Sequence, residues 1–374
     1  MLNLALIRAI NVDDIRLVND LEVIRLNLTW KSDNRLEIRD LIYRYDEYLL
    51  NAIEILTEDK SISKESNRLF IELLSCLTKN EILHILRNPI LSRYLIDEEW
   101  RKYPESAVNS AFDLFSETIT RKLAKINSPK SNRIGLNNLI DEREIYLSTS
   151  SFGNLDRNSI SIDNGKKNYI PLMNRGGNSL FPYSRIEVDG ILLKLHSSFR
   201  EIFDTSQAAH HYTFSFTEAL FVRKELEFPE KFSSGSFRRH VGLSLLCNPH
   251  LESVSISDCA SSIVHEAIHS NIYMAEAFGQ TITDASSNDL SCLSPWSGSL
   301  LNLDSFIQAC FVWFGLFNYW RLSELKEESK DTIEFITKGF ASLPSKTVEK
   351  HMSNILTPDV VDIIRSMEAE AKYV

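Results

Sequence analysis

Hydrophobic residues recur every three or four positions along the first third of the chain, which is the spacing of an amphipathic helix. The clearest run contains Leu41, Ile42, Tyr45, Tyr48, Leu49, Ala52, Ile53 and Leu56. This pattern extends from residue 2 to about residue 125, with a break at Asn88-Pro89. We therefore predict a helical N-terminal region over residues 1–127.

From residue 128 the composition shifts to Asn, Ser, Gly and Pro, with short β-like runs between loops. We expect short strands at residues 160–162 and 186–188, and further strands at residues 213–216 and 241–246, where apolar and polar residues alternate or an apolar run is short.

The chain from Asp258 onward returns to a helical pattern. Residues 306–320 are rich in aromatic side chains, but they fall short of the about 18 apolar residues that a membrane span needs. Because Gln308 and Asn318 lie inside this stretch, we predict a buried helix. The predicted fold class is α+β: predominantly helical, with a small, mostly antiparallel sheet beside a buried metal-binding helix. Residues 128–374 are expected to form one continuous catalytic unit.

Charge and cysteine content narrow the class of protein. With 41 Lys and Arg against 51 Asp and Glu, the formal charge is −10, so the chain has no basic face for DNA or RNA. The five cysteines are an odd number and contain no C-x-x-C pair, which argues against a disulfide framework or a thiolate zinc site. Without a signal-peptide pattern at the N-terminus, we expect a cytoplasmic protein with no membrane partner. The sequence gives no indication of an oligomeric state.

The most specific motif is H-E-x-x-H, formed by His265, Glu266 and His269. Residues four apart on a helix differ by about 40° and about 6 Å along the axis, so both imidazoles can bind one divalent ion. Asp258 is the expected N-cap of this helix and Gly279 its expected end. The alternative is a pair of core histidines that binds nothing.

A metal site needs at least one more protein ligand. Glu276 is about 10 Å beyond His269 along the helix, and we expect it to be a solvated or paired surface acid. The metzincin pattern is excluded because no third histidine follows His269 at the required spacing. The aromatic helix offers Asp304 and Gln308, one turn apart on one face.

The order of elements adds a resemblance. The strand V-G-L-S-L-L, the helix with H-E-A-I-H, the triplet Ser294-Pro295-Trp296 and an aromatic helix together resemble the H-E-x-x-H peptide-modification proteins of ribosomal natural-product gene clusters. The similarity covers mainly residues 239–320. It implies an Fe(II)- and 2-oxoglutarate-dependent β-hydroxylase whose partner is a ribosomally synthesised precursor peptide.

The resemblance also suggests site residues, with two departures. The family's Leu-His-Gly triplet falls here on residues 307–309, so Gln308 stands where the family has a histidine and becomes the predicted third metal ligand. The arginines that follow the Ser-Pro-Trp triplet in the family have no counterpart before Arg321. If a missing arginine holds the 2-oxoglutarate carboxylate, Arg238 and Arg239 are the nearest replacements along the chain.

Other polar residues are weaker candidates. His210 and His211 adjoin each other before an expected strand, so they would point to opposite faces and could not both bind one ion. His240 is a candidate support or substrate contact on the strand that leads to the metal helix, and Tyr273 is a candidate hydrogen-bond donor; for both, structural packing is the simpler interpretation.

The sequence is also compatible with two other functions. The same motif suits a zinc metallopeptidase with Glu266 as the general base. The protein could also be an inactive relative that binds a peptide, because Gln308 replaces the family histidine. In the leading hypothesis His265, His269 and Gln308 hold iron, and Glu266 is the catalytic residue that orients a ligand or water.

Overall fold

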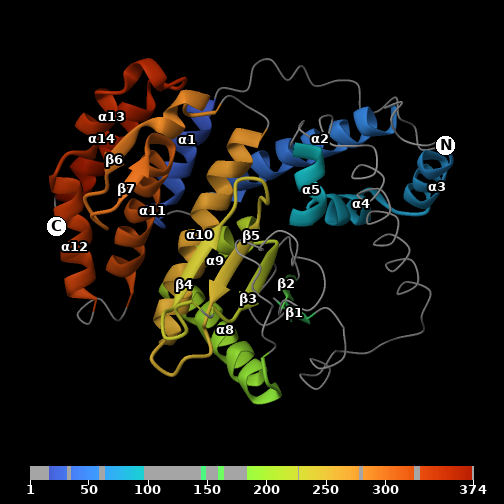
Figure 1. Ribbon diagram of the computed structural model, residues 1–374, viewed down its shortest axis with the longest axis horizontal. Helices are drawn as coiled ribbons and strands as arrows, with labels where there is room; N and C mark the ends of the chain where they lie inside the picture. Colours follow the sequence, from blue (N-terminus) through green and yellow to red (C-terminus); the bar gives the residue numbers. More distant parts are fainter. Residues whose placement is uncertain are drawn as a thin grey trace.

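The computed structural model describes residues 17–31, 35–58, 64–96, 145–148, 159–163, 183–225, 227–277, 281–323 and 329–372. Helices form the larger part of this structure, and one mixed sheet and one hairpin supply the strands (Figure 1). The predicted α+β class with a predominance of helix is confirmed. The boundary at residues 127 and 128 lies outside the described residues, so the predicted division of the chain stays a prediction.

The described N-terminal part is helical, as the apolar periodicity predicts. Its helices are α1 (Leu17–Asn27), α2 (Arg35–Glu58), α3 (Lys64–Ser75), α4 (Lys79–Leu86) and α5 (Pro89–Ile96). In α2 the predicted apolar face is buried at Leu41, Tyr45, Leu49 and Ile53. Pro89 begins α5, so the Asn88-Pro89 break falls between two helices. The first residue of a helix donates no backbone hydrogen bond within that helix, so proline is tolerated there.

The larger sheet has the strand order β1-β2-β3-β5-β4. Its strands are β1 (Ile145–Ser148), β2 (Ser159–Asp163), β3 (Ala219–Arg223), β4 (Ser233–Ser236) and β5 (Leu243–Cys247). The outer pairs β1–β2 and β4–β5 are antiparallel, whereas β2–β3 and β3–β5 are parallel. The sheet is therefore mixed, and the antiparallel pairings lie at its two edges.

The two central strands are buried on both faces. Leu220, Val222 and Leu246 belong to the main hydrophobic core, and the alternate residues, such as Phe221 and Leu245, form a second, smaller cluster. An apolar run without alternation is typical of a strand that is covered on both sides. This confirms the predicted strand within residues 241–246.

Two expected strands are helices instead. Residues 186–188 lie in α8 (Arg185–Thr205), where Ser184 and Glu187 form a reciprocal capping box. Residues 213–216 lie in α9 (Gln207–Phe216), which Ser206 caps. The alternation at residues 213–216 misleads because Thr213, Phe214 and Phe216 are all buried, so the polar positions do not mark a solvent face.

The C-terminal part surrounds one long helix. Its elements are α10 (Ile256–Ala277), η5 (Ala285–Asp289), the hairpin β6 (Ser291–Leu293) and β7 (Leu300–Asn302), α11 (Leu303–Leu322), α12 (Lys330–Ala341), α13 (Pro344–Glu349), η6 (Met352–Asn354) and α14 (Val360–Lys372). Helix α11 is the predicted aromatic helix, and it is buried over most of its length. No described helix is long and apolar enough to cross a bilayer.

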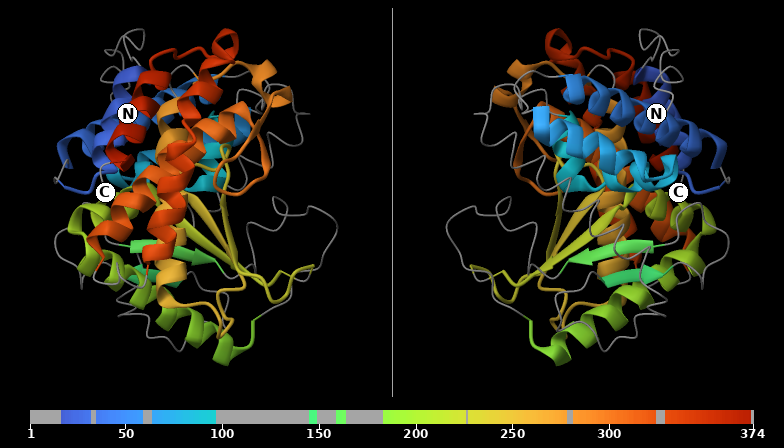
Figure 2. Two further views of the ribbon diagram at one scale, coloured as in Figure 1. Left: turned by 90° about the vertical axis from the view of Figure 1, so that its left-hand side faces the viewer. Right: turned by 90° about the vertical axis from the view of Figure 1, so that its right-hand side faces the viewer.

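Helix α10 is the centre of the molecule. It contacts α1, α2, α8, α9 and α11, and it also lies against strands β4 and β5 of the sheet. Figures 1 and 2 show it between the C-terminal helices on one side and the sheet with α8 on the other. All five cysteines are free, four of them buried, in agreement with the predicted absence of a disulfide framework.

Candidate metal centre

Helix α10 begins three residues earlier than its sequence suggests. The Ser255 hydroxyl accepts a hydrogen bond from the Asp258 amide (3.0 Å), and the Asp258 carboxylate accepts one from the Ser255 amide (2.8 Å). This reciprocal pair places the cap at Ser255, so the prediction of Asp258 as N-cap is wrong. The predicted end at Gly279 lies outside the described residues.

An ammonium group fixes the loop that leads into this helix. Lys194 of α8 donates to the backbone carbonyls of Pro249, Leu251 and Val254, at 2.9, 2.8 and 2.7 Å. Three charge-assisted bonds hold this loop against α8. Such a position for Lys194 carries no signal in the sequence.

The motif residues come together as their spacing predicts. One ligand atom from each of His265, Glu266 and His269 can be chosen so that all three lie within 4.8 Å of one another. The centroids of the two imidazole rings, of His265 and His269, are 5.1 Å apart. This group could hold a metal ion, and the side chain of His265 is 31% exposed, which leaves the group open to ligands from one side.

Burial controls the charge of the two imidazoles. Removal from water lowers the pKa of His265 to about 4 and also lowers the pKa of His269. Both side chains are therefore neutral at pH 7, the state in which an imidazole nitrogen can bind a metal.

Glu266 is almost completely buried between α10 and the edge strand β4. Its Oε1 accepts a hydrogen bond of 2.6 Å from the Ser234 hydroxyl, and burial raises the pKa of its carboxyl group. Ser236 of β4 opposes this rise in pKa as a second hydrogen-bonding side chain, while the buried Oε2 makes no hydrogen bond of normal geometry in the described part of the chain. A buried carboxylate oxygen without a partner is costly, and a cation beside it would remove that cost. The donor set thus fits a divalent ion.

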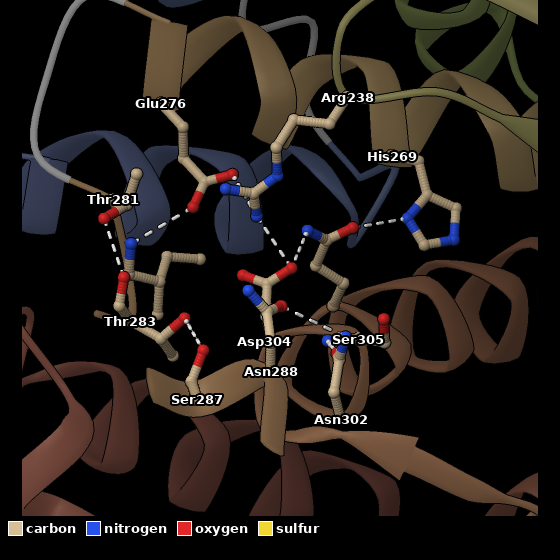
Figure 3. A network of polar contacts seen from close by, with 12 residues as sticks. Arg238, His269, Glu276, Thr281, Thr283, Ser287, Asn288, Asn302, Asp304 and Ser305 are labelled. Carbon is tan, nitrogen blue, oxygen red and sulfur yellow. Dashed lines mark hydrogen bonds and ion pairs between the residues drawn. The ribbon is translucent and has the colours of Figure 1, made fainter. Parts of the chain in front are cut away.

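A chain of polar contacts leads away from His269. Its Nδ1 lies 2.8 Å from Gln308 Oε1, and Gln308 Nε2 donates to Asp304 Oδ2 at 3.0 Å. Arg238 then pairs with Asp304 at 2.7 Å and with Glu276 at 3.1 Å, as Figure 3 shows. The two candidates on α11 therefore lie beside the metal group, and the assignment of Gln308 as a third ligand stays a prediction.

Two expectations about this chain of contacts need correction. Glu276 is paired but is not a surface acid, because its side chain is 3% exposed and its Oε1 also accepts the backbone N–H of Ile282. Arg238 and Arg239 lie in the turn between β4 and β5. Since two carboxylates already engage Arg238, it is poorly suited to bind the carboxylate of a cosubstrate.

The two weaker candidates, His240 and Tyr273, make packing and hydrogen-bonding contacts within the fold. His240 is also in the turn, and its Nδ1 lies 3.2 Å from the Pro89 carbonyl oxygen. Tyr273 stacks on the His269 ring, with the ring centroids 5.9 Å apart, and the Arg238 guanidinium lies 5.7 Å from its ring centroid. Tyr273 thus helps to hold His269 in place.

The adjacent histidines His210 and His211 are buried, and so is Trp296. His210 and His211 are buried on helix α9, so the geometry that was expected from a strand is wrong. Trp296 of the Ser-Pro-Trp triplet is buried, and its Nε1 donates to the Ile336 carbonyl of α12 at 3.1 Å. The triplet thus anchors the β6–β7 hairpin to α12.

Ser234 is the site residue that sequence reasoning missed. It lies in the stretch S-S-G-S, which resembles a loop more than a strand. Only the pairing of β4 with β5 brings its hydroxyl to Glu266. Comparison with known proteins adds no relative, because no protein-family model and no curated protein matches the chain.

Proposed function

We propose that this protein is a metal-dependent enzyme that uses Fe(II) and 2-oxoglutarate to hydroxylate a side chain of a ribosomally made precursor peptide. The observation that carries the proposal is the group of two neutral imidazoles and one buried carboxylate within 4.8 Å. Two histidines and a carboxylate with open positions are the donor set typical of non-haem iron oxygenases. The resemblance of residues 239–320 supports the cosubstrate and the peptide.

Each site residue has a distinct task in this proposal. His265 and His269 would hold the ion through imidazole nitrogens. Glu266, which Ser234 orients through Oε1, would supply the carboxylate in place of the predicted ligand Gln308, whose Oε1 lies 2.8 Å from His269 Nδ1. Fe(II) with 2-oxoglutarate supplies the oxidation: one atom of O₂ enters the peptide C–H bond, and the other enters succinate as CO₂ leaves. The exposed side of His265 is where substrates would approach.

The peptide partner is supported by charge and by the resemblance. A formal charge of −10 favours a partner with basic residues, because complementary charge speeds the encounter of two molecules. Arg238 is held by Asp304 and Glu276, so it is not free to bind the carboxylate of 2-oxoglutarate.

The test uses the purified protein with Fe(II), 2-oxoglutarate and the precursor peptide encoded beside its gene. We expect succinate and a mass gain of about 16 daltons, one oxygen atom, per modified side chain. His265→Ala should abolish both products, whereas His351→Ala, the same change at a histidine outside the group, should leave them unchanged. Neither succinate nor a mass gain with iron-loaded protein would refute the proposal.

A second candidate function rests on Glu266. Its raised pKa and its unpartnered Oε2 also suit a general base that takes a proton from water, as in zinc metallopeptidases with the same motif. Metal analysis after purification without chelators separates the two functions. Iron favours the hydroxylase, and zinc together with cleavage of the peptide, lost in Glu266→Gln, favours the peptidase.

A further inference from the structure

Gln308 links His269 to Asp304, and the two contacts that it makes define which atoms donate and which accept. A carboxylate can only accept hydrogen bonds, and Arg238 can only donate them. Asp304 therefore requires the NH₂ group of Gln308 to face it, and the amide oxygen must face His269. The Nδ1 of His269 must then carry the proton, because two acceptors cannot share a hydrogen bond.

We propose that Asp304 and Gln308 are positioning residues that fix His269 in the tautomer with a proton on Nδ1 and a bare Nε2, ready to bind the metal. Metal-binding histidines usually donate their second N–H directly to a carboxylate or a carbonyl. Here an amide stands between the histidine and the carboxylate. The inference relies on the proposed function only in taking His269 as a metal ligand.

Burial makes this arrangement rigid. The exposure of Gln308 is 2% and the Asp304 side chain is 15% exposed, and both lie in the first two turns of α11, one turn apart. Asn302 caps this helix by accepting the Ser305 N–H at 2.8 Å (Figure 3).

The far end of the network fixes Asp304 in turn. Arg238 lies between Asp304 and Glu276, so it joins the start of α11 to the end of α10. Glu276 is held on its other side by the Ile282 N–H at 3.1 Å. The orientation of the His269 ring thus depends on contacts from α10, α11 and the β4–β5 turn.

The decisive measurement is the protonation of the His269 nitrogens in metal-free protein, by NMR with ¹⁵N-labelled histidine. We expect the wild type to carry its proton on Nδ1 alone. Asp304→Asn replaces one accepting oxygen with a donating NH₂ group, so position 304 can face either end of the Gln308 amide. The amide can then turn over, and His269 should populate both tautomers. Asp362→Asn, the same change on an exposed helix surface, serves as the control for the substitution itself.

A double variant tests the donor and acceptor logic directly. Asp304→Asn combined with Gln308→Glu exchanges the amide and the carboxylate, so the new carboxylate can accept from both the histidine and the new amide. The Nδ1 tautomer should return. Zn(II) affinity, measured by titration of the metal alone, should fall about 10- to 100-fold in Asp304→Asn and recover in the double variant.

The outcomes separate this inference from the proposed function. A proton on Nε2 of His269 in the wild type, or an unchanged tautomer and affinity in Asp304→Asn, overturns the inference whatever reaction the protein catalyses. If Asp304→Asn does not fold, Gln308→Met removes the acceptor at similar volume, and an unchanged tautomer there overturns it equally. Failure to hydroxylate a peptide leaves the tautomer result intact and contradicts only the proposed function.

Discussion

Glu276 is a buried carboxylate that shares its arginine partner, Arg238, with Asp304, and this setting determines its pKa. Arg238 favours the charged form of Glu276, while Asp304 and burial oppose it. Burial is the largest of these effects, and it raises the pKa of Glu276 to about 7, against 4.5 for an ordinary glutamate. The carboxyl group therefore titrates near neutral pH in the folded protein.

This shift predicts a pH dependence of stability with a definite sign. Between pH 4.5 and about 7 the unfolded chain has lost the Glu276 proton and the folded protein retains it, so folding becomes less favourable as pH rises through this window. Glu276→Gln should remove that contribution. Its stability relative to the wild type should therefore increase from about pH 5 to about pH 8, measured by urea unfolding.

Glu349→Gln is the matched control, because that carboxylate is half-exposed on α13 and pairs with Arg365. Its difference from the wild type, measured across the same pH range, is the baseline for the substitution itself. A Glu276→Gln difference that follows this baseline would contradict the assignment.

The residues of the motif were predictable because their geometry is local. Helical spacing alone brings His265, Glu266 and His269 together, and one face of α11 pairs Asp304 with Gln308. The partners that come from elsewhere were not predictable. Glu276 looks like a surface acid until the fold brings the β4–β5 turn with Arg238 to the end of α10.

At the scale of elements, the close approach of α10 and α11 joins the metal group to its support. Gly315 of α11 permits it: a methyl group there would lie 2.5 Å from Ile268 Cδ1 and 3.1 Å from Leu28 Cδ2. Ile268 is the residue before His269. The separation of the two helices at this point therefore influences the reach of Gln308 to the imidazole.

Gly315→Ala should destabilise the protein by about 1–3 kcal/mol through overpacking, despite the better helix propensity of alanine. Gly190→Ala in α8 is the control, since nothing lies within 4 Å of the added methyl group, and it should stabilise by about 0.5–1 kcal/mol. Urea unfolding of both variants measures the difference. Equal stabilisation by the two substitutions would show that α10 and α11 are not tightly packed.

The two elements that the sequence misassigns have different causes. Helix α9 is buried around most of its surface, so its apolar and polar positions follow no simple period. Helix α8 begins with Ser184 and Glu187 at capping-box spacing, a start signal that outweighs the β-branched residues after it. Strand β5 was predictable because its short, mostly apolar run is too short for a buried helix. Strand β3, which lies beside it, was not predicted.

At the scale of the whole molecule, one hydrophobic core joins the first described helix to the last. It contains Leu21 of α1, Leu41 of α2, Phe199 of α8, Ile268 of α10 and Met367 of α14. The metal group lies on the helix that this core surrounds, so an ion bound there should stabilise the fold as a whole.

The gain in stability follows from mass action. A divalent ion at 100 times its dissociation constant should stabilise the wild type by about 2.7 kcal/mol and raise its apparent melting temperature. His269→Ala should abolish this response, whereas His351→Ala should retain it. Differential scanning calorimetry with and without Zn(II) measures the effect, and an equal response in His269→Ala would place the ion elsewhere.

The contact between α1 and α14 has a consequence for how the protein is made. Arg25 of α1 forms an ion pair with Glu370 of α14, and α14 also packs on α11 and α12. A ribosome releases the chain from its N-terminus, so α1 and α11 emerge before the helix that covers them has been translated. Until α14 leaves the exit tunnel, their apolar side chains stay accessible, and we expect the nascent chain to need protection by chaperones up to that moment.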